Sequence, residues 1–92
     1  MKENDIVKAI LKYLKTVPYC FSWKEHGGMY GTAGIPDIIA CVNGRFIAFE
    51  VKTKIGKTTA LQDATIRKIN AARGTAVVVR SVAEVRTIIE GL

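Results

Sequence analysis

The sequence predicts an α/β protein whose mixed sheet is flanked by helices, in the order α-β-β-β-α-β-α. An Asn43-Gly44 pair stands between two apolar runs, which is the strongest short-range signal for a β-hairpin. Two segments of helical periodicity each follow a capping-box pattern, and the apolar run 75–79 lies between them. A strand, a helix and a strand in succession form a crossover unit, so the last strand should run parallel to the second hairpin strand.

The N-terminal segment is predicted to be a helix over 3–16, because the residue before Pro18 disfavours helical geometry. Its apolar positions recur at helical spacing; they are Ile6, Val7, Ile10, Leu11 and Leu14. Residues 19–24 alternate aromatic with smaller side chains, which is typical of a strand. Because a packed strand shows such alternation, we expect its aromatic side chains to be core rather than a platform for stacking bases; they are Tyr19, Phe21 and Trp23.

The two later helices have explicit start and stop signals. Thr59-x-x-Gln62 has the form of a capping box, and Gly74 is the expected stop of the helix that follows. Its apolar side is predicted to consist of Leu61, Ala64, Ile69 and Ala72. Ser81-x-x-Glu84 repeats the pattern for a last helix that ends at Gly91. The apolar stripe of that helix is predicted to consist of Val82, Val85 and Ile89.

Length and composition limit the kind of protein. With 92 residues and 49% hydrophobic side chains, we expect one globular domain over 1–92. No apolar run approaches the ~20 residues of a membrane span, and the N-terminus has no signal-peptide pattern, so we expect a soluble cytoplasmic protein without a membrane partner. Cys20 and Cys41 lack C-x-x-C spacing, and we expect free core thiols rather than a zinc site or a disulfide.

The positive charge is concentrated in the second half of the chain. There are 14 Lys and Arg against 8 Asp and Glu, and residues 51–92 carry +5 of the net +6. Lysine and arginine neutralise phosphates and release counterions, so this balance points weakly to a polyanion partner.

The hairpin register brings two carboxyl groups together. With a two-residue turn at Asn43-Gly44, paired residues have numbers that sum to 87, so Asp37 faces Glu50. Directly opposed residues have Cβ atoms about 4.5–5.5 Å apart, where two negative charges repel unless a cation lies between them. Carboxylate oxygens without a nearby thiol or imidazole pattern favour Mg²⁺ or Mn²⁺.

Glu50 and Lys52 share one strand face because side chains alternate along a strand. A metal that lowers the pKa of a bound water, beside an ammonium group, favours phosphodiester hydrolysis. No small-molecule cofactor is needed for this chemistry. The alternative is a solvated strand face with a simple ion pair between Glu50 and Lys52.

Gly34-Ile-Pro-Asp37, a gap of 12 residues, and Glu50-Val-Lys52 resemble the motif of the PD-(D/E)xK nucleases. Gln62 makes the chain similar to the virus-type replication-repair nucleases (VRR-NUC). The resemblance implies a restriction-endonuclease-like core and assigns catalytic roles to the two acids, Lys52 and Gln62. It also implies metal binding by Asp37, Glu50, the Val51 carbonyl and Glu3, which lies in the first helix.

Several of these residues have an ordinary structural explanation as well. An acid in a first helical turn, such as Glu3, is favoured by the helix dipole alone, and a capping box already explains Gln62. Lys54 and Lys57 form either a solvated basic edge or contacts to DNA phosphates.

The remaining candidates lie in a loop with four glycines among residues 27–34. His26, Gly27 and Gly28 either contact the nucleic acid or are incidental features of this loop.

The resemblance implies a Mg²⁺- or Mn²⁺-dependent DNA endonuclease that acts on branched DNA as a homodimer, like Holliday-junction resolvases, in a bacterial or phage-infected cell. A chain this short has little room for a separate domain that reads DNA sequence. Two alternatives stay open: a basic nucleic-acid-binding module with little catalysis, and a nuclease of the same family without junction preference, on DNA or RNA.

Overall fold

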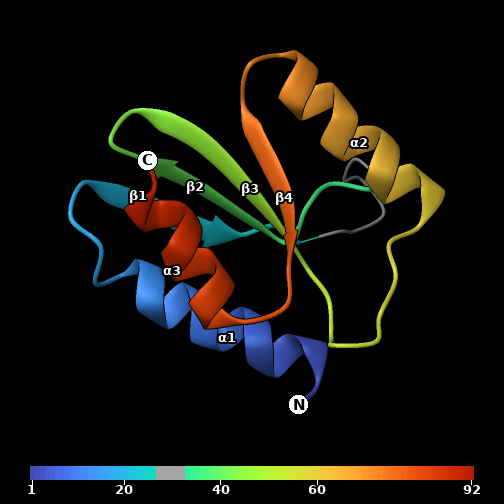
Figure 1. Ribbon diagram of the computed structural model, residues 1–92, viewed down its shortest axis with the longest axis horizontal. Helices are drawn as coiled ribbons and strands as arrows, with labels where there is room; N and C mark the ends of the chain where they lie inside the picture. The colour runs from blue at the N-terminus through green and yellow to red at the C-terminus, as the bar shows by residue number, and fades with distance from the viewer. Residues whose placement is uncertain (27–32) are drawn as a thin grey trace.

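The computed structural model describes residues 1–26 and 33–92, and its elements follow the predicted order (Figure 1). The helices are α1 (Glu3–Leu14), α2 (Ala60–Ala71) and α3 (Val82–Glu90). The strands are β1 (Cys20–Lys24), β2 (Ile38–Val42), β3 (Arg45–Val51) and β4 (Thr75–Val79). Within these described residues, no helix has the length and apolar character needed to cross a membrane.

The strands form one mixed sheet in the order β1-β2-β3-β4. The first three strands pair antiparallel, and β3 pairs with β4 in parallel through the crossover that contains α2. Sheet and connection therefore match the sequence prediction of a hairpin followed by a crossover unit.

The hairpin turn sets the register of β2 and β3. Asn43 has φ 50° and Gly44 has φ 81°, so both central residues occupy the left-handed region that a type I′ turn requires. Val42 pairs with Arg45, and the same spacing continues to Ile38 and Phe49 at the far end. The predicted register is thus confirmed over the whole ladder.

The main core lies between the sheet and the pair α1 and α3. Ile10 and Leu14 of α1 and Val85 of α3 are fully buried against the inward side chains of β3, including Phe49 and Val51. Figure 1 shows α1 and α3 together on one side of the strands and α2 on the other. The predicted stripe of the last helix is confirmed, because Val82 and Ile89 pack against this core.

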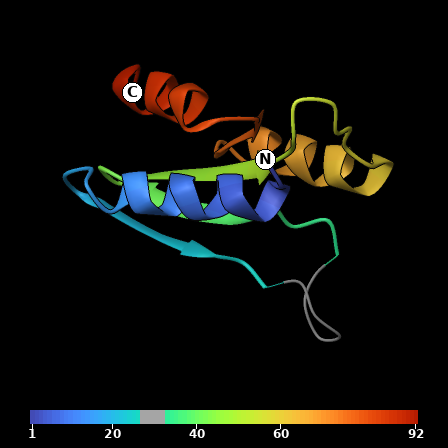
Figure 2. The same ribbon diagram turned by 90° about the horizontal axis from the view of Figure 1, so that it is seen from below.

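The second face of the sheet has only a small core. Ile66 and Ile69 of α2 pack against a cluster of buried residues, Ile39, Ala48 and Ala76. The helix contacts β4 and leaves β1 uncovered, so one half of this face has no helix over it within the described chain (Figure 2).

The predicted core position of the aromatic side chains is therefore wrong. The exposed fractions are 86% for Tyr19, 71% for Phe21 and 41% for Trp23, and the Cys41 thiol is exposed too. Alternation along a strand identifies which residues share a face, but it does not say which face a helix covers. Cys20 points to the other face and packs against the main core, as predicted.

Two helix ends also differ from the prediction. The first helix ends at Leu14 rather than at residue 16. Both the backbone N–H (2.9 Å) and the hydroxyl (2.7 Å) of Thr16 donate to the Tyr13 carbonyl, which closes a turn in place of a further helical residue. After α2, the left-handed residue is Arg73 (φ 74°) rather than Gly74. Gly74 serves close packing instead, because a Cβ there would lie 3.1 Å from the Phe46 ring.

The predicted apolar side of α2 is also partly wrong. Ile69 packs on the sheet, but its partner there is Ile66, whereas Leu61 is 52% exposed. No residue of α2 is fully buried. The helix is held on the sheet by Ile66 and Ile69 and by the Asn70 side chain, which accepts from the Ala76 backbone N–H (2.8 Å) and donates to the Ala76 carbonyl (3.1 Å).

Candidate active site

Asp37 lies where β2 begins, next to the end of β3. One step beyond the Ile38 and Phe49 pair, the register places Asp37 opposite Glu50, as predicted. The Asp37 carboxylate oxygen Oδ2 accepts a 2.7 Å hydrogen bond from the Val51 backbone N–H. The Asp37 backbone carbonyl accepts a 2.8 Å bond from the N–H of Glu25, just after β1. Contacts with β3 and with the residue after β1 thus hold Asp37 in position at the start of β2.

Glu50 is a buried acid whose protonation is strongly perturbed. Its exposed fraction is only 2%. Burial first, and then hydrogen bonding with Asp37 and the negative charge of Asp37, raise the pKa of Glu50 from 4.5 to about 8, while the Lys52 ammonium opposes the rise. Two acids that face each other, one buried and one half-buried, favour a bound cation, because a cation offsets their repulsion.

Lys52 borders the same carboxyl group. Its Nζ lies 3.9 Å from Glu50 Oε2, and its side chain is 11% exposed. The Lys52 backbone N–H donates to the Val79 carbonyl of β4 (3.0 Å), which anchors the residue to the neighbouring strand. Because Glu50 and Lys52 are both buried, the alternative of a solvated ion pair on an open strand face does not apply.

Gln62 both caps α2 and contacts the candidate site, the two roles that the sequence left open for it. Its Oε1 accepts from the Thr59 backbone N–H (2.9 Å), and its own backbone N–H donates to the Thr59 hydroxyl, so the capping box is complete. Since the amide oxygen is used by the cap, the amide nitrogen points the other way and donates to Glu50 Oε2 over 3.5 Å. The cap of α2 therefore aims a donor at the buried acid.

Glu3, at the start of α1, contributes charge but not close contact. Its negative charge raises the pKa of Glu50 further, after burial and Asp37. Within the described residues, however, no three Asp, Glu, His or Cys side chains lie close enough together to hold a metal ion. The role of Glu3 as a ligand stays a prediction.

The donor atoms that meet at this place fit Mg²⁺ or Mn²⁺. The N–H of Val51 points to Asp37, and the carbonyl of a strand residue leaves on the same side as its N–H. Two carboxyl groups and the Val51 carbonyl would hold such an ion through hard oxygen donors. With so few protein donors, coordination positions remain for water and a phosphate oxygen.

The loop between β3 and α2 carries the basic candidates. Lys54 and Lys57 are both exposed, as expected for a basic edge. The Arg80 guanidinium, just after β4, donates to the carbonyls of Thr53 (2.5 Å) and Gly56 (2.8 Å), so it holds this loop in place. The sequence prediction did not include Arg80. Because β4 runs parallel to β3, however, a residue directly after β4 lies at the sheet edge where β3 also ends.

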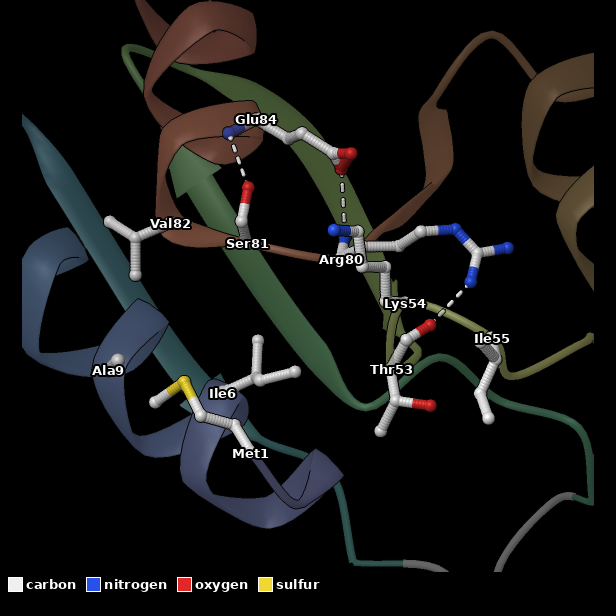
Figure 3. A pocket seen from close by; sticks show the side chains of 10 residues that line it. All are labelled: Met1, Ile6, Ala9, Thr53, Lys54, Ile55, Arg80, Ser81, Val82 and Glu84. Carbon is white, nitrogen blue, oxygen red and sulfur yellow. Dashed lines mark hydrogen bonds between the residues drawn. The ribbon is translucent and has the colours of Figure 1, made fainter.

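A groove of about 970 Å³ lies on the other side of this loop (Figure 3). Its walls are apolar side chains of α1 and α3, such as Ile6 and Val82, and its rim includes Lys54 and Arg80. Neither Asp37 nor Glu50 lines it. This groove therefore does not contain the two acids of the candidate site.

Gly34 connects the motif to α2. It has φ 81°, and a Cβ there would lie 2.8 Å from Leu61 Cγ and 3.0 Å from the Leu61 carbonyl oxygen. Only glycine meets both conditions, positive φ and close approach. The strand that carries Asp37 and the helix that carries Gln62 are thereby packed against each other.

The remaining candidates are not brought to the site by any described contact. His26 is exposed and follows β1. Gly27 and Gly28 lie outside the described residues.

Comparison with known proteins identifies the fold. No protein-family model and no curated protein matches the sequence. Among solved structures, a VRR_NUC domain superposes with a TM-score of 0.80 at 21% identity, covering 96% of this chain and 94% of that one. A VRR_NUC domain protein superposes with a TM-score of 0.78 at 19% identity, covering 99% of this chain and 87% of the other. The chain therefore has the fold of the VRR_NUC domain, as its motif spacing predicts.

Proposed function

We propose that this chain is a VRR-NUC nuclease that hydrolyses phosphodiester bonds of DNA with Mg²⁺ or Mn²⁺. The observation that carries the proposal is the meeting of Asp37 and Glu50 across the hairpin, with Lys52 beside them, in a chain with the VRR_NUC fold. A buried acid opposite a second, half-buried acid has no evident structural purpose, since a buried charge opposes folding unless it is compensated.

Each residue has a distinct task in this mechanism. Asp37 and Glu50 bind the cation, and the backbone N–H of Val51 keeps the Asp37 carboxylate oriented. When bound, a divalent cation polarises the phosphate and lowers the pKa of a water nucleophile. Lys52 Nζ stabilises negative charge that develops on the phosphate oxygens or orients the attacking water. Gln62 holds the Glu50 carboxylate in position through its amide nitrogen.

The substrate we propose is branched DNA, cut by a homodimer. A net charge of +6 supports a polyanionic substrate, and the basic loop with Lys54 and Lys57 follows directly after Lys52. Recognition of DNA shape is favoured over sequence, because the described helices and strands all belong to the VRR_NUC-like fold. Two-fold symmetry would supply one active site for each of two strands.

The test is cleavage of a four-way junction, a flap and a linear duplex with Mg²⁺ or Mn²⁺. We expect metal-dependent cutting by the wild type, strongest on the junction. Lys52→Ala and Asp37→Asn should reduce the rate by about 10²–10³-fold, the usual effect of losing one group that stabilises a transition state. Exposed residues on and just after α1 give matched controls: Asp5→Asn and Lys15→Ala should cut at the wild-type rate.

Equal cutting by wild type, Lys52→Ala and Asp37→Asn would reject the nuclease assignment. Binding without any cutting would favour a basic nucleic-acid-binding module. Cutting of flaps or duplexes alone would remove the junction preference and leave the nuclease.

A further inference from the structure

The aromatic side chains of β1 stand on the same face of the sheet as the candidate site. The register pairs Trp23 with Ile39 and Ile39 with Ala48, which makes one row across three strands. Asp37 and Glu50 form the row two residues further along, and side chains alternate along a strand, so both rows share one face. Asp37 is the diagonal neighbour of Trp23 in the pair of β1 and β2, a spacing of about 7–8 Å that an aromatic side chain can span. The indole is therefore a near neighbour of the two acids.

A further row of this face continues the aromatic surface away from the acids. The register places Phe21, Cys41 and Phe46 in line across the same strands. Phe21, Trp23 and Phe46, which we call the aromatic patch, are 71%, 41% and 47% exposed. The rings of Phe21 and Trp23 lie with their centroids 5.8 Å apart. Exposed rings on a sheet face can stack unpaired bases, as they do in sheet proteins that bind single-stranded RNA.

Cations border the aromatic patch at both ends. Lys52 of the candidate site lies at one end, and at the other Arg45 and Arg73 line a hollow of about 620 Å³ together with Phe46. Phe46 and Glu50 are four residues apart on β3, which is about 13 Å along a strand. A stacked DNA strand covers this length with about four nucleotides. Aromatic rings between cations are the combination by which proteins bind single strands.

The surroundings of Trp23 favour a base over a phosphate. Its indole N–H donates to the Glu25 carboxylate over 3.0 Å, which holds the edge of the ring in place before any ligand binds. The negative charge of Glu25 repels a phosphate here, whereas an aromatic face can stack on a base of any identity. A DNA strand would therefore turn its bases towards the patch and its phosphates towards the cations at the two ends.

We propose that the aromatic patch stacks unpaired nucleotides of the DNA strand that is cut, next to the scissile phosphate. This inference rests on the proposed function and adds what the substrate offers to the site: bases that have left the duplex stack. Leaving the stack costs least for bases that are already unpaired, as in a flap or at an open branch point. The patch thus selects branched DNA by its structure and not by its sequence.

The experiment compares bases with the backbone alone. Two four-way junctions carry a short unpaired segment at the branch point, made of thymidines in one and of abasic nucleotides in the other. Binding is measured in a chelator, so that metal-dependent cutting does not occur. Trp23 is the one tryptophan of the chain, so its fluorescence reports on the patch. We expect the thymidine junction to quench this fluorescence and to bind about 10-fold more tightly than the abasic junction.

Substitutions separate stacking from simple apolar contact. Phe21→Leu keeps an apolar side chain without an aromatic face, so it should bind the thymidine junction about 10-fold more weakly and the abasic junction as the wild type does. Phe21→Tyr keeps the aromatic face and should bind both junctions like the wild type. The matched control is Leu92→Ala, because Leu92 is 43% exposed and follows α3 on the opposite side of the sheet (Figure 1). This variant should bind both junctions normally.

Three results would overturn the proposal. The first is equal binding of the thymidine and abasic junctions by the wild type, without a difference in Trp23 fluorescence. The second is a Phe21→Leu protein that loses affinity for both junctions alike. The third is a Phe21→Leu protein that binds DNA normally but changes its oligomeric state in sedimentation, since the patch would then bind protein.

The stacking surface and the nuclease can fail separately. Cleavage of the same junctions is measured after Mg²⁺ is added. A wild type that prefers the thymidine junction in a chelator but cuts no DNA with Mg²⁺ rejects the proposed activity alone. A wild type that cuts DNA with Mg²⁺ but binds both junctions equally rejects the aromatic patch alone.

Discussion

In the candidate site, the free-energy cost of burying an acid falls on one residue, Glu50. Buried opposite Asp37, it binds a proton up to a pH of about 8, far above the usual range for a glutamate. An acid perturbed by burial and by a specific charged partner is typical of functional sites, in agreement with the proposed role of Glu50.

The raised pKa of Glu50 predicts a pH dependence of stability in the metal-free protein. Because the folded state holds a proton that the unfolded state releases near pH 4.5, the free energy of unfolding should fall as pH rises from 4.5 to about 8. Glu50→Gln has no titratable group at this position, so its free energy of unfolding lacks this pH-dependent contribution. In a chelator, the melting temperature of Glu50→Gln relative to wild type should therefore increase from about pH 5 to about pH 8.5.

Differential scanning calorimetry of both proteins checks this prediction, with Glu90→Gln as the control for an exposed glutamate. If the melting temperatures of wild type and Glu50→Gln ran parallel across this pH range, Glu50 would not be protonated in the folded protein.

The sequence identified most of the site because its residues are tied together by backbone rules. A two-residue turn fixes the register, so the meeting of Asp37 and Glu50 follows from the position of Asn43-Gly44. The contact of Gln62 with Glu50 could not be predicted, because it depends on how α2 packs across the sheet. Arg80 was missed for the same reason: its loop contacts span more than twenty residues of sequence.

At the scale of elements, the sequence predicted strands and caps better than the faces that helices cover. Capping boxes and the hairpin turn are local patterns, so their chemistry can be read directly. Whether β1 lies beneath a helix is a tertiary question. The aromatic side chains of β1 look like core residues in sequence, and they are exposed because α2 packs beside β4 instead.

Arg80 makes a prediction for the loop between β3 and α2. Arg80→Gln removes the donors to the Thr53 and Gly56 carbonyls, so the backbone after Lys52 should loosen. We expect faster amide hydrogen exchange over 53–56 and a rate of cleavage about 10-fold lower, with a smaller change in KM, because misplacement of Lys52 affects the chemical step.

Arg67→Gln is the matched control, since Arg67 is an exposed arginine of α2. Unchanged exchange over 53–56 in Arg80→Gln would contradict the anchoring role. A rise in KM alone would indicate that Arg80 contacts DNA instead.

At the scale of the whole molecule, most of the net charge of +6 comes from the second half of the sequence. Residues 51–92 carry eight basic and three acidic side chains. Lys54 and Lys57, in the loop after β3, are both exposed. In the proposed nuclease, this loop is the expected place for contacts with phosphates.

The proposed role of this basic loop predicts the salt dependence of DNA binding. Lys54→Ala with Lys57→Ala should weaken binding to all DNA sequences alike and reduce the slope of log affinity against log salt by about 2, near 0.9 for each lost phosphate contact. Lys12→Ala with Lys15→Ala removes the same charge from two exposed positions at the C-terminal end of α1 and should leave the slope unchanged. Fluorescence anisotropy across a salt series measures both, and equal slopes for the two pairs would refute the assignment of the basic loop.

The most direct test of the central claim is Mn²⁺ binding, measured by titration calorimetry and by the spin resonance signal of the free ion. We predict that the wild type and Lys52→Ala bind Mn²⁺ equally well, although Lys52→Ala should cut DNA about 10²–10³-fold more slowly. Asp37→Asn should bind at least about 10-fold more weakly, because one of the two carboxylate ligands is lost. Equal binding by Asp37→Asn and wild type, or no binding by wild type, would contradict the claim that the hairpin brings these acids together to hold a metal ion.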